Sequence, residues 1–369
     1  AALANGTISH ALDYDDTHFA YLGHPSVAVF PAALAIAQSI EASSERFLVA
    51  ALIGMEVTAR IGSWLGRHHH RVGFHSTATA GTFGSAMAAS RLLDLNETQT
   101  HYALGLAATR ASGLRAQFGT MGKPFHAGMA ASNGVEAALL AKLGFESRPD
   151  TLEAVQGFAI THGAEMIDQT QILKQLGDSW IIEDVMHKYH ACCHGIHASL
   201  EGLLEARKIL SASPEEIISV SISVPPRYLN VCDIQEPRTG LEAKFSYRLC
   251  AGMVLAGRDT AALSTFSDTA CRDTELVMLR DKIEVTGDEN LTETEAIVRV
   301  STADGRCVEV THDINIPTNI DIREEKIKSK AWALLGENSA IELWDTVKVA
   351  EPYKIEEWLQ KQIPSHFVG

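Results

Sequence analysis

Apolar and polar positions repeat with a helical period through most of the first half of the chain. Apolar residues spaced three and four apart predict helices, and several of these stretches follow a good capping residue. Ser43 or Ser44 can cap the second helix, and Asn96 with Gln99 has the pattern of a capping box. The predicted helices cover about residues 31–40, 44–61, 76–93, 97–106 and 126–143.

Small residues occupy many positions on the faces where these helices are expected to meet. Alanine, glycine and serine allow helix axes to approach closely, so we expect a compact helical bundle. The Gly-x-x-x-Gly spacings lie in a setting too polar for membrane helices. We find no apolar run long enough to span a bilayer and no signal peptide, and we predict no membrane association.

The pattern changes after about residue 186. Ser213-Pro214 followed by two glutamates predicts a helix start. Residues 218–224 then alternate between apolar and polar positions and end at a proline pair, as a strand does. Further strands are expected near 282–285, 295–300 and 307–310, the last after a hairpin turn at Asp304-Gly305.

The predicted fold class is mainly α with an inserted α+β domain. A helical domain covers residues 1–186, and a smaller α+β domain covers 187–317. The chain is again helical and charged from about Arg323, so residues 318–369 are expected to form C-terminal helices that return to the first domain.

Composition restricts the kinds of partner. The 369-residue chain has a formal net charge of −15, which argues against a nucleic-acid surface because phosphate binding needs a basic face. A small anionic substrate needs only a local basic pocket. Six thinly spread cysteines fit a reduced, cytoplasmic setting better than a disulfide framework. The chain begins at Ala1 without a methionine, which leaves open whether an N-terminal segment is missing.

The first polar motif is the most informative part of the chain. It places three carboxylates, two imidazoles and a hydroxyl directly before an apolar helix, a setting that can bind anions and move protons. The alternative interpretation is helix capping in a solvated loop. Its polar residues are Asp13, Asp15, Asp16, Thr17, His18 and His24.

Two further motifs precede predicted helices. In the run His68 to His70, consecutive side chains on a helix point about 100° apart, so at most two could share a metal. His75 follows a glycine and could point into a cleft, although an exposed structural histidine is the plainer interpretation. Lys123 lies in a glycine-rich turn, where an ammonium can meet a carboxylate, but the spacing is not that of a P-loop.

The fourth motif runs from His187 to His197 and resembles a zinc site superficially. Its adjacent Cys192 and Cys193 lack the Cys-x-x-Cys spacing, and no second ligand pair lies at a suitable distance, so we predict no metal. A cationic, imidazole-rich turn between a strand and a helix, facing the other motifs, is the favoured interpretation.

These four motifs, in this order, resemble the MmgE/PrpD family, which includes 2-methylcitrate dehydratases, cis-aconitate decarboxylases and iminodisuccinate epimerase. The segment from Asp13 to Ser26 is the most specific part, and residues 242–246 resemble a segment of the smaller domain. The resemblance implies a helical domain, a smaller α+β lid with the site between them, a homodimer, and neither metal nor cofactor. It also implies a helical segment before the first motif, which we expect this chain to lack.

The resemblance assigns roles residue by residue. A site histidine of the decarboxylases falls at Cys193 and a site tyrosine at about Leu249, and related sequences often have tyrosine at the position of His70; the first two departures favour a dehydratase or epimerase over a decarboxylase. The predicted catalytic residues are His24, His75, Lys123 and Asp13, and the predicted substrate-binding residues are Thr17, Lys188, His70, Cys193 and His197.

We therefore hypothesise proton transfer, without a cofactor, at the carbon α to a carboxylate of a small di- or tricarboxylate. His24 is the first candidate for the base or acid and His75 the second, while Lys123 and Lys188 supply positive charge. The alternatives are a cis-aconitate-type decarboxylase and a family member that binds a carboxylate without turning it over.

Overall fold

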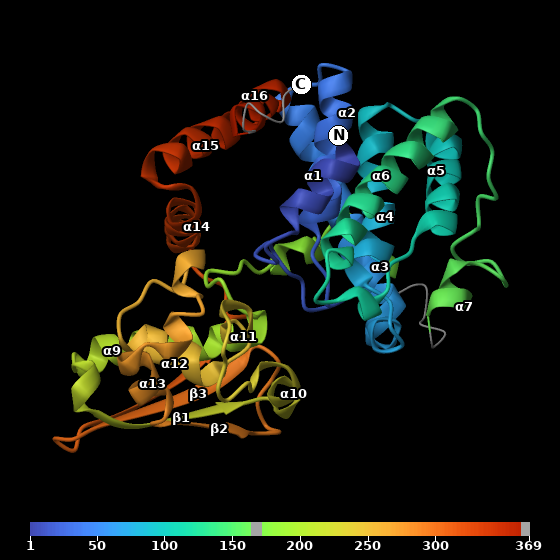
Figure 1. Cartoon of the computed structure of the whole chain (residues 1–369). Coiled ribbons are helices and arrows are strands. Elements are labelled where there is room, and N and C mark those ends of the chain that lie inside the picture. Colours follow the sequence, from blue (N-terminus) through green and yellow to red (C-terminus); the bar gives the residue numbers. More distant parts are fainter. Residues whose placement is uncertain (164–171, 363–369) are drawn as a thin grey trace. The chain divides into compact units, whose positions relative to one another are not determined.

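The computed structural model describes residues 1–163 and 172–362 (Figure 1). The chain divides into two compact units. The first unit comprises Ala1–His187 and Leu343–Gly369, and the second comprises Lys188–Glu342. The first break lies one residue from the predicted one. The second break lies near 342 rather than 317, because helix α14 (Ile320–Leu335) is joined to the second unit by an ion pair between Lys326 and Glu201.

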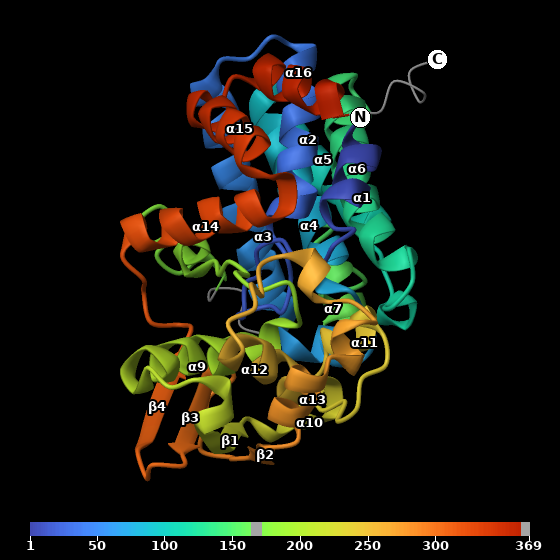
Figure 2. The same cartoon turned by 60° about the vertical axis from the view of Figure 1, so that its left-hand side comes forward.

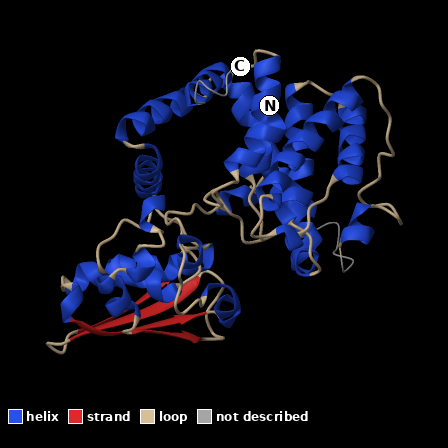
Figure 3. Cartoon of the chain, in the orientation of Figure 1, coloured by secondary structure: helices blue, strands red, loops and turns tan. Residues whose placement is uncertain are grey.

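The first unit is built from helices, as Figure 3 shows in blue. Helix α4 is buried along almost its whole length and packs against α2, α3, α5 and α6. Glycines permit the close approach, since a Cβ at Gly54 would come within 2.7 Å of the Gly84 carbonyl oxygen. The helices are α1 (Ala2–Ser9), α2 (Ser26–Ser39), α3 (Ser44–Arg71), α4 (Ser76–Leu92), α5 (Glu97–Arg110), α6 (Gly122–Lys142), α7 (Phe158–His162) and α16 (Pro352–Gln362), with α15 (Glu337–Val349) crossing the break.

The predicted caps of two helices are confirmed. The Ser43 hydroxyl accepts from the backbone N–H of Arg46 at the start of α3. Asn96 and Gln99 form both halves of the capping box of α5. Both signals are local in sequence, which is why they could be recognised without the tertiary structure.

Three expectations about the helices of this unit were wrong: where α2 begins, where α6 begins, and that no helix precedes the first motif. Helix α2 begins at Ser26 rather than at Pro31, because the Asp16 carboxylate accepts from the Ser26 amide and hydroxyl and caps the end from a distance in sequence. Helix α6 begins at Gly122, so Lys123 lies in its first turn and not in a preceding loop. Helix α1 precedes the first motif, contrary to the expectation that no helical segment would do so.

Helix α3 also contradicts the expectation that no apolar run is long enough to span a bilayer. It has 28 residues and an 18-residue window with a mean hydropathy of 1.4, so its length and composition would allow it to cross a membrane. Of that window, 61% is buried inside the protein. Such burial is typical of a core helix, and a single helix of this kind is weak support for a membrane span.

The second unit contains one four-stranded sheet with the order β2-β1-β3-β4, shown in red in Figure 3. Strand β1 pairs parallel with β2 and antiparallel with β3, and β3 pairs antiparallel with β4. Helices α9, α12 and α13 lie on one face (Figure 2). The strands are β1 (Ile217–Val224), β2 (Ile283–Gly287), β3 (Glu295–Thr302) and β4 (Cys307–Asp313).

Alternation along β1 explains the one-sided packing. Val220, Ile222 and Val224 are buried, whereas Ser219 and Ser221 are exposed. The predicted helix at Ser213 was wrong in length: Ser213 and Glu216 form a capping box, but only a 3-10 turn (Pro214–Glu216) follows before β1 begins. The helices of this unit are α9 (His197–Leu210), α10 (Leu229–Cys232), α11 (Gly240–Ala243), α12 (Tyr247–Leu255), α13 (Thr274–Arg280) and α14.

Candidate active site

The first polar motif folds back onto the end of helix α1. His10 follows the last residue of α1, and its side chain is fully buried. Its Nδ1 donates to Asp15 Oδ1 at 2.9 Å, and Asp15 Oδ2 lies 2.7 Å from His24 Nδ1. The buried Asp15 carboxylate therefore bridges two imidazoles.

Lys123 reaches the same cluster from the first turn of α6. Its Nζ lies 2.7 Å from Asp13 Oδ1, and the same oxygen lies 3.6 Å from His24 Nε2. Asp13 has a positive φ of 50°, an uncommon conformation for a residue with a side chain, which marks the turn that directs it there. The outer nitrogen of His24 and the Lys123 ammonium thus share one carboxylate, which is 42% exposed.

His75 joins the cluster from the N-terminus of α4. Its backbone N–H donates to the Gly113 carbonyl at 2.9 Å, and its ring stacks on His10 with centroids 5.9 Å apart. Its Nδ1 lies 3.2 Å from His126 Nδ1. One nitrogen must donate and the other accept, so the two rings cannot both be protonated in this arrangement.

The surroundings favour the neutral forms of His24 and His75 and the ionised form of Asp15. Burial lowers the pKa of His24, although the Asp15 charge opposes this change. Burial, together with repulsion from His10 and Lys123, lowers the pKa of His75 well below its usual value. Burial alone would raise the pKa of Asp15, but His24 and His10 outweigh it and lower that pKa well below the usual range. Neutral His24 can therefore accept a proton near neutral pH.

The same side chains have the composition of a metal site. His10, Asp13, Asp15 and His24 offer ligand atoms that all lie within 4.8 Å of one another. His10 donates to Asp15 within this set, and the ammonium of Lys123 lies 2.7 Å from one candidate ligand oxygen, on Asp13. A divalent cation at that oxygen would have to displace the ammonium. The Asp13 carboxylate therefore favours the Lys123 ammonium over a metal ion.

Other residues of the first motif have structural contacts. Asp16 caps α2, and His18 Nε2 lies 2.7 Å from the Ile181 carbonyl oxygen. The backbone of Thr17 forms a two-way bridge with Met186. The capping interpretation was therefore correct for Asp16, whereas Asp13, Asp15 and His24 converge on the cluster.

Two histidines of the run at the end of α3 have different surroundings. His69 is buried, bonds to the His162 carbonyl and the Thr79 hydroxyl, and stacks on Phe74. His70 lies 3.5 Å from the hydroxyl of Ser76, the first residue of α4. The predicted substrate-binding residue His70 is thus beside the start of the helix that follows His75.

The fourth motif lies in the second unit, from Lys188 onward. No strand precedes it in the described part of the chain, so the predicted strand-to-helix turn was wrong; an irregular segment leads into α9 instead. Lys188 is 3% exposed and His197 is 1% exposed. Burial and the neighbouring histidines lower the pKa of His197 well below its usual value. His190 bonds to Thr260 and supports this segment from inside.

The two positions at which the resemblance implies departures from the decarboxylases, Cys193 and Leu249, are also in this unit. Leu249 is fully buried in α12, where an apolar side chain contributes to the core. Tyr247 lies two residues earlier, and its hydroxyl donates to the Gly195 carbonyl at 2.8 Å. Burial raises the pKa of Tyr247 well above its usual value, which makes it a structural donor. Cys193 is half-buried and reduced.

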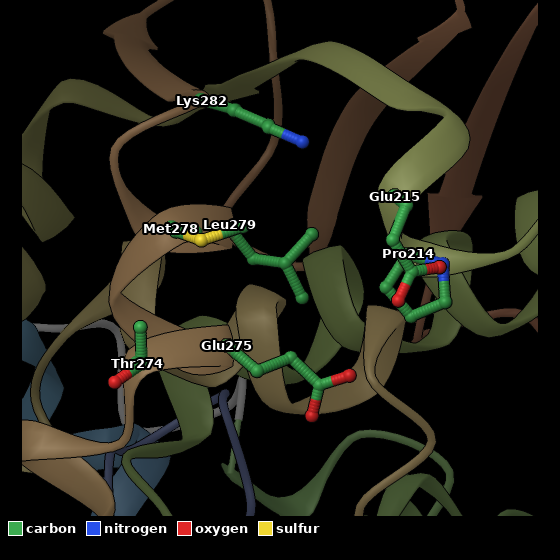
Figure 4. A pocket seen from close by; sticks show the side chains of 7 residues that line it. All are labelled: Pro214, Glu215, Thr274, Glu275, Met278, Leu279 and Lys282. Carbon is green, nitrogen blue, oxygen red and sulfur yellow. The ribbon is translucent and has the colours of Figure 1, made fainter.

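A separate hollow of the second unit, with a volume of about 270 Å³, contains none of the predicted residues (Figure 4). Lys282 is the cation in its lining, and its ammonium already donates to the Ile217 carbonyl at 2.6 Å. Glu215 and Glu275 also line it, so the hollow does not favour an anion.

Sequence reasoning missed three contributors to the site. His10 was taken as part of no motif, yet it contacts both predicted proton carriers, His24 and His75. His126 bonds to His75, and the Phe118 ring lies 5.2 Å from the Lys123 ammonium. Helical spacing gave no signal for His10, because residues 10–15 form turns after α1 and these turns bring His10 to Asp15.

Comparison with known proteins identifies the family of the chain. Residues 1–166 match the MmgE/PrpD N-terminal domain, and residues 190–347 match the MmgE/PrpD C-terminal domain. The chain belongs to the MmgE/PrpD family. The motif-based resemblance is therefore confirmed, and the junction between the two matched domains lies close to the break between the two units.

Similar proteins include cis-aconitate decarboxylases from three organisms. The chain is 32% identical over 220 residues to that of Homo sapiens, covering 58% of this chain and 45% of the relative. It is 29% identical over 273 residues to that of Mus musculus (69% and 54%), and 31% identical over 216 residues to that of Aspergillus terreus (55% and 44%). The chain spans about half the length of the curated relatives it matches.

Proposed function

We propose that this chain is a lyase or epimerase that acts on a small di- or tricarboxylate by proton transfer at the carbon α to a carboxylate, with no cofactor. The observation that carries the proposal is the position of His24. Its buried imidazole is held by Asp15 at one nitrogen, while its other nitrogen faces the carboxylate that pairs with Lys123. A proton acceptor and a cation are thus available to one small anion.

The chemistry requires both groups. A carbon α to a carboxylate is weakly acidic, so the charge that develops on the carboxylate oxygens needs stabilisation. The Lys123 ammonium supplies a compact positive charge. Asp13 neutralises this ammonium, and an incoming substrate carboxylate competes with Asp13 for it. His24 then accepts or returns the proton, and His75 is the second carrier.

Two groups of reactions remain candidates, each with its own support. Dehydration or epimerisation is favoured by Cys193 and by the buried Leu249, the positions at which the motif resemblance implies a histidine and a tyrosine in the decarboxylases. Decarboxylation of a cis-aconitate-type substrate is favoured by the relatives, all five of which are named cis-aconitate decarboxylase or a protein like it. Both routes pass through a carbanion next to a carboxylate and use the same His24 and Lys123.

The test is incubation of the purified protein in D₂O with 2-methylcitrate, cis-aconitate and a set of C4 to C6 dicarboxylates, followed by NMR. We expect deuterium at the carbon α to a carboxylate. Loss of CO₂ from cis-aconitate with a deuterated C5 product identifies decarboxylation, whereas loss of water from 2-methylcitrate identifies dehydration. Deuterium exchange with inversion identifies epimerisation.

Matched variants connect the result to the site. His24→Ala should abolish exchange, whereas His101→Ala, at an exposed histidine of α5, should leave it unchanged. Binding that raises the melting temperature without any exchange would replace the proposal with a carboxylate-binding protein. Normal turnover by His24→Ala would remove His24 from the mechanism.

The remaining assignments are part of the same proposal. Thr17, Lys188, His70, Cys193 and His197 are proposed to bind substrate. Lys188→Met is expected to raise KM more than it lowers kcat if that lysine holds a substrate carboxylate. A homodimer and a cytoplasmic location are further predictions, which sedimentation and fractionation can test.

A further inference from the structure

We infer that Asp15 and His10 form a buried positioning pair that fixes the tautomer of His24 and directs its Nε2 toward the substrate. The inference rests on the proposed role of His24 as the proton carrier. Neither residue was among the predicted catalytic groups, and neither needs to touch substrate.

The carboxylate determines the tautomer. Ionised Asp15 can only accept hydrogen bonds, and His24 Nδ1 lies 2.7 Å from its Oδ2. The contact is an ion pair whose angle is not that of a hydrogen bond, and the adjacent negative charge favours the proton of neutral His24 on Nδ1, which leaves the lone pair on Nε2. Nε2 is the nitrogen that faces Asp13 and the Lys123 pair. A carboxylate behind an imidazole holds a general base in this way in other enzymes.

His10 holds the carboxylate. Its Nδ1 donates to Asp15 Oδ1 at 2.9 Å, and its ring packs edge-on against His24 with centroids 4.6 Å apart. Asp15 thus has one oxygen for each imidazole and cannot rotate without losing a partner. The His10 side chain has no exposed surface, so this hydrogen bond is shielded from competing water.

A purely structural role explains His10 poorly. Its Nε2 is buried and has no hydrogen-bond partner within the described residues. An unsatisfied buried polar atom is unfavourable, and a leucine or phenylalanine would fill the space without that penalty. What an apolar residue cannot do is donate to Asp15. The donor at Nδ1 is therefore the feature that the site needs.

The experiment combines kinetics with the tautomer itself. In protein labelled with ¹⁵N at histidine, the ring nitrogen shifts of His24, assigned with His24→Gln, report which nitrogen carries the proton. We expect the Nδ1–H tautomer in the native protein. In Asp15→Asn we expect a shift toward the Nε2–H tautomer, with kcat lowered on the order of 10²- to 10⁴-fold and KM changed only a few-fold.

Three further variants separate positioning from folding. His10→Asn keeps a donor near the position of Nδ1 and should retain at least tenfold more activity than His10→Leu at equal melting temperature. Asp16→Asn alters a neighbouring carboxylate of the same motif, which caps α2 by accepting from Ser26. It should lower the melting temperature without changing the His24 tautomer.

The outcomes are distinct from those of the proposed function. An Nε2–H tautomer of His24 in the native protein, or native kcat in folded Asp15→Asn, would overturn the positioning role while leaving proton transfer in place. Because the NMR measurement needs no turnover, absence of any activity would count against the proposed function alone. Equal activity of His10→Asn and His10→Leu would remove His10 from the pair.

Discussion

The Lys123 ammonium lies 2.7 Å from the Asp13 carboxylate, which joins the first turn of α6 to the turn after α1. The pair is partly exposed, so its contribution to the free energy of unfolding is small, about 1 kcal/mol or less. The pair matters for the proposed chemistry rather than for stability, because it places a cation beside Nε2 of His24.

Lys123→Met should therefore damage catalysis far more than stability. Removing the cation that stabilises the developing anion is expected to lower kcat/KM by about 10²- to 10³-fold, or about 3–4 kcal/mol. The melting temperature should change by only a few degrees. Steady-state kinetics and thermal unfolding measure both effects. Lys123→Arg retains the charge and should recover part of the activity; equal loss in both variants would mean that geometry rather than charge matters.

Gly113→Ala should disturb the His75–His126 pair. Gly113 has a φ of +137°, and a Cβ there would lie 2.8 Å from Ala78 Cβ and 3.4 Å from the His126 ring. The matched control is Gly119→Ala, which also has a positive φ (+84°) but open space around the added methyl group. We expect about 1 kcal/mol of destabilisation for Gly119→Ala and clearly more for Gly113→Ala. Similar unfolding midpoints in urea for the two variants would contradict the steric argument.

Acid should destabilise the first unit through His69. Burial lowers the pKa of His69 to about 4, against an ordinary value of 6.5. The unfolded chain therefore binds a proton that the folded chain does not, so the free energy of unfolding falls as the pH drops from about 6.5 toward 4. The loss in the free energy of unfolding from this one histidine is at most about 3 kcal/mol.

The check is urea unfolding at several pH values. His69→Gln cannot titrate, so its stability should vary less with pH between 6.5 and 4 than that of the native protein, even if the variant is less stable throughout. His101→Gln, at an exposed position, should keep the native pH dependence. Parallel curves for the native protein and His69→Gln would rule out this histidine as the source.

Chelation should leave activity intact. The four side chains that could ligate a metal are engaged with one another and with Lys123. We expect dialysis against EDTA to leave kcat unchanged and added Zn²⁺ to inhibit by displacing the ammonium from Asp13. Elemental analysis of the purified protein, with activity assays before and after dialysis, tests this. Loss of activity that Zn²⁺ restores would establish a metal enzyme instead.

The sequence by itself determined the helical first half, the caps at Ser43 and Asn96, the strands after residue 217 and the family. These features depend on periodicity and on contacts within a few residues, which are readable along the chain.

Only the tertiary structure decided which polar residue meets which. Asp13, Asp15 and Asp16 are near neighbours in sequence, yet one pairs with Lys123, one bridges His10 and His24, and one caps α2. The left-handed backbone at Asp13 directs its side chain toward Lys123 of the distant helix α6, whereas the partners of Asp15 and Asp16 lie nearby in sequence. Composition and spacing do not show which way each side chain of a turn points. Packing between helices that are far apart in the chain fixes that direction.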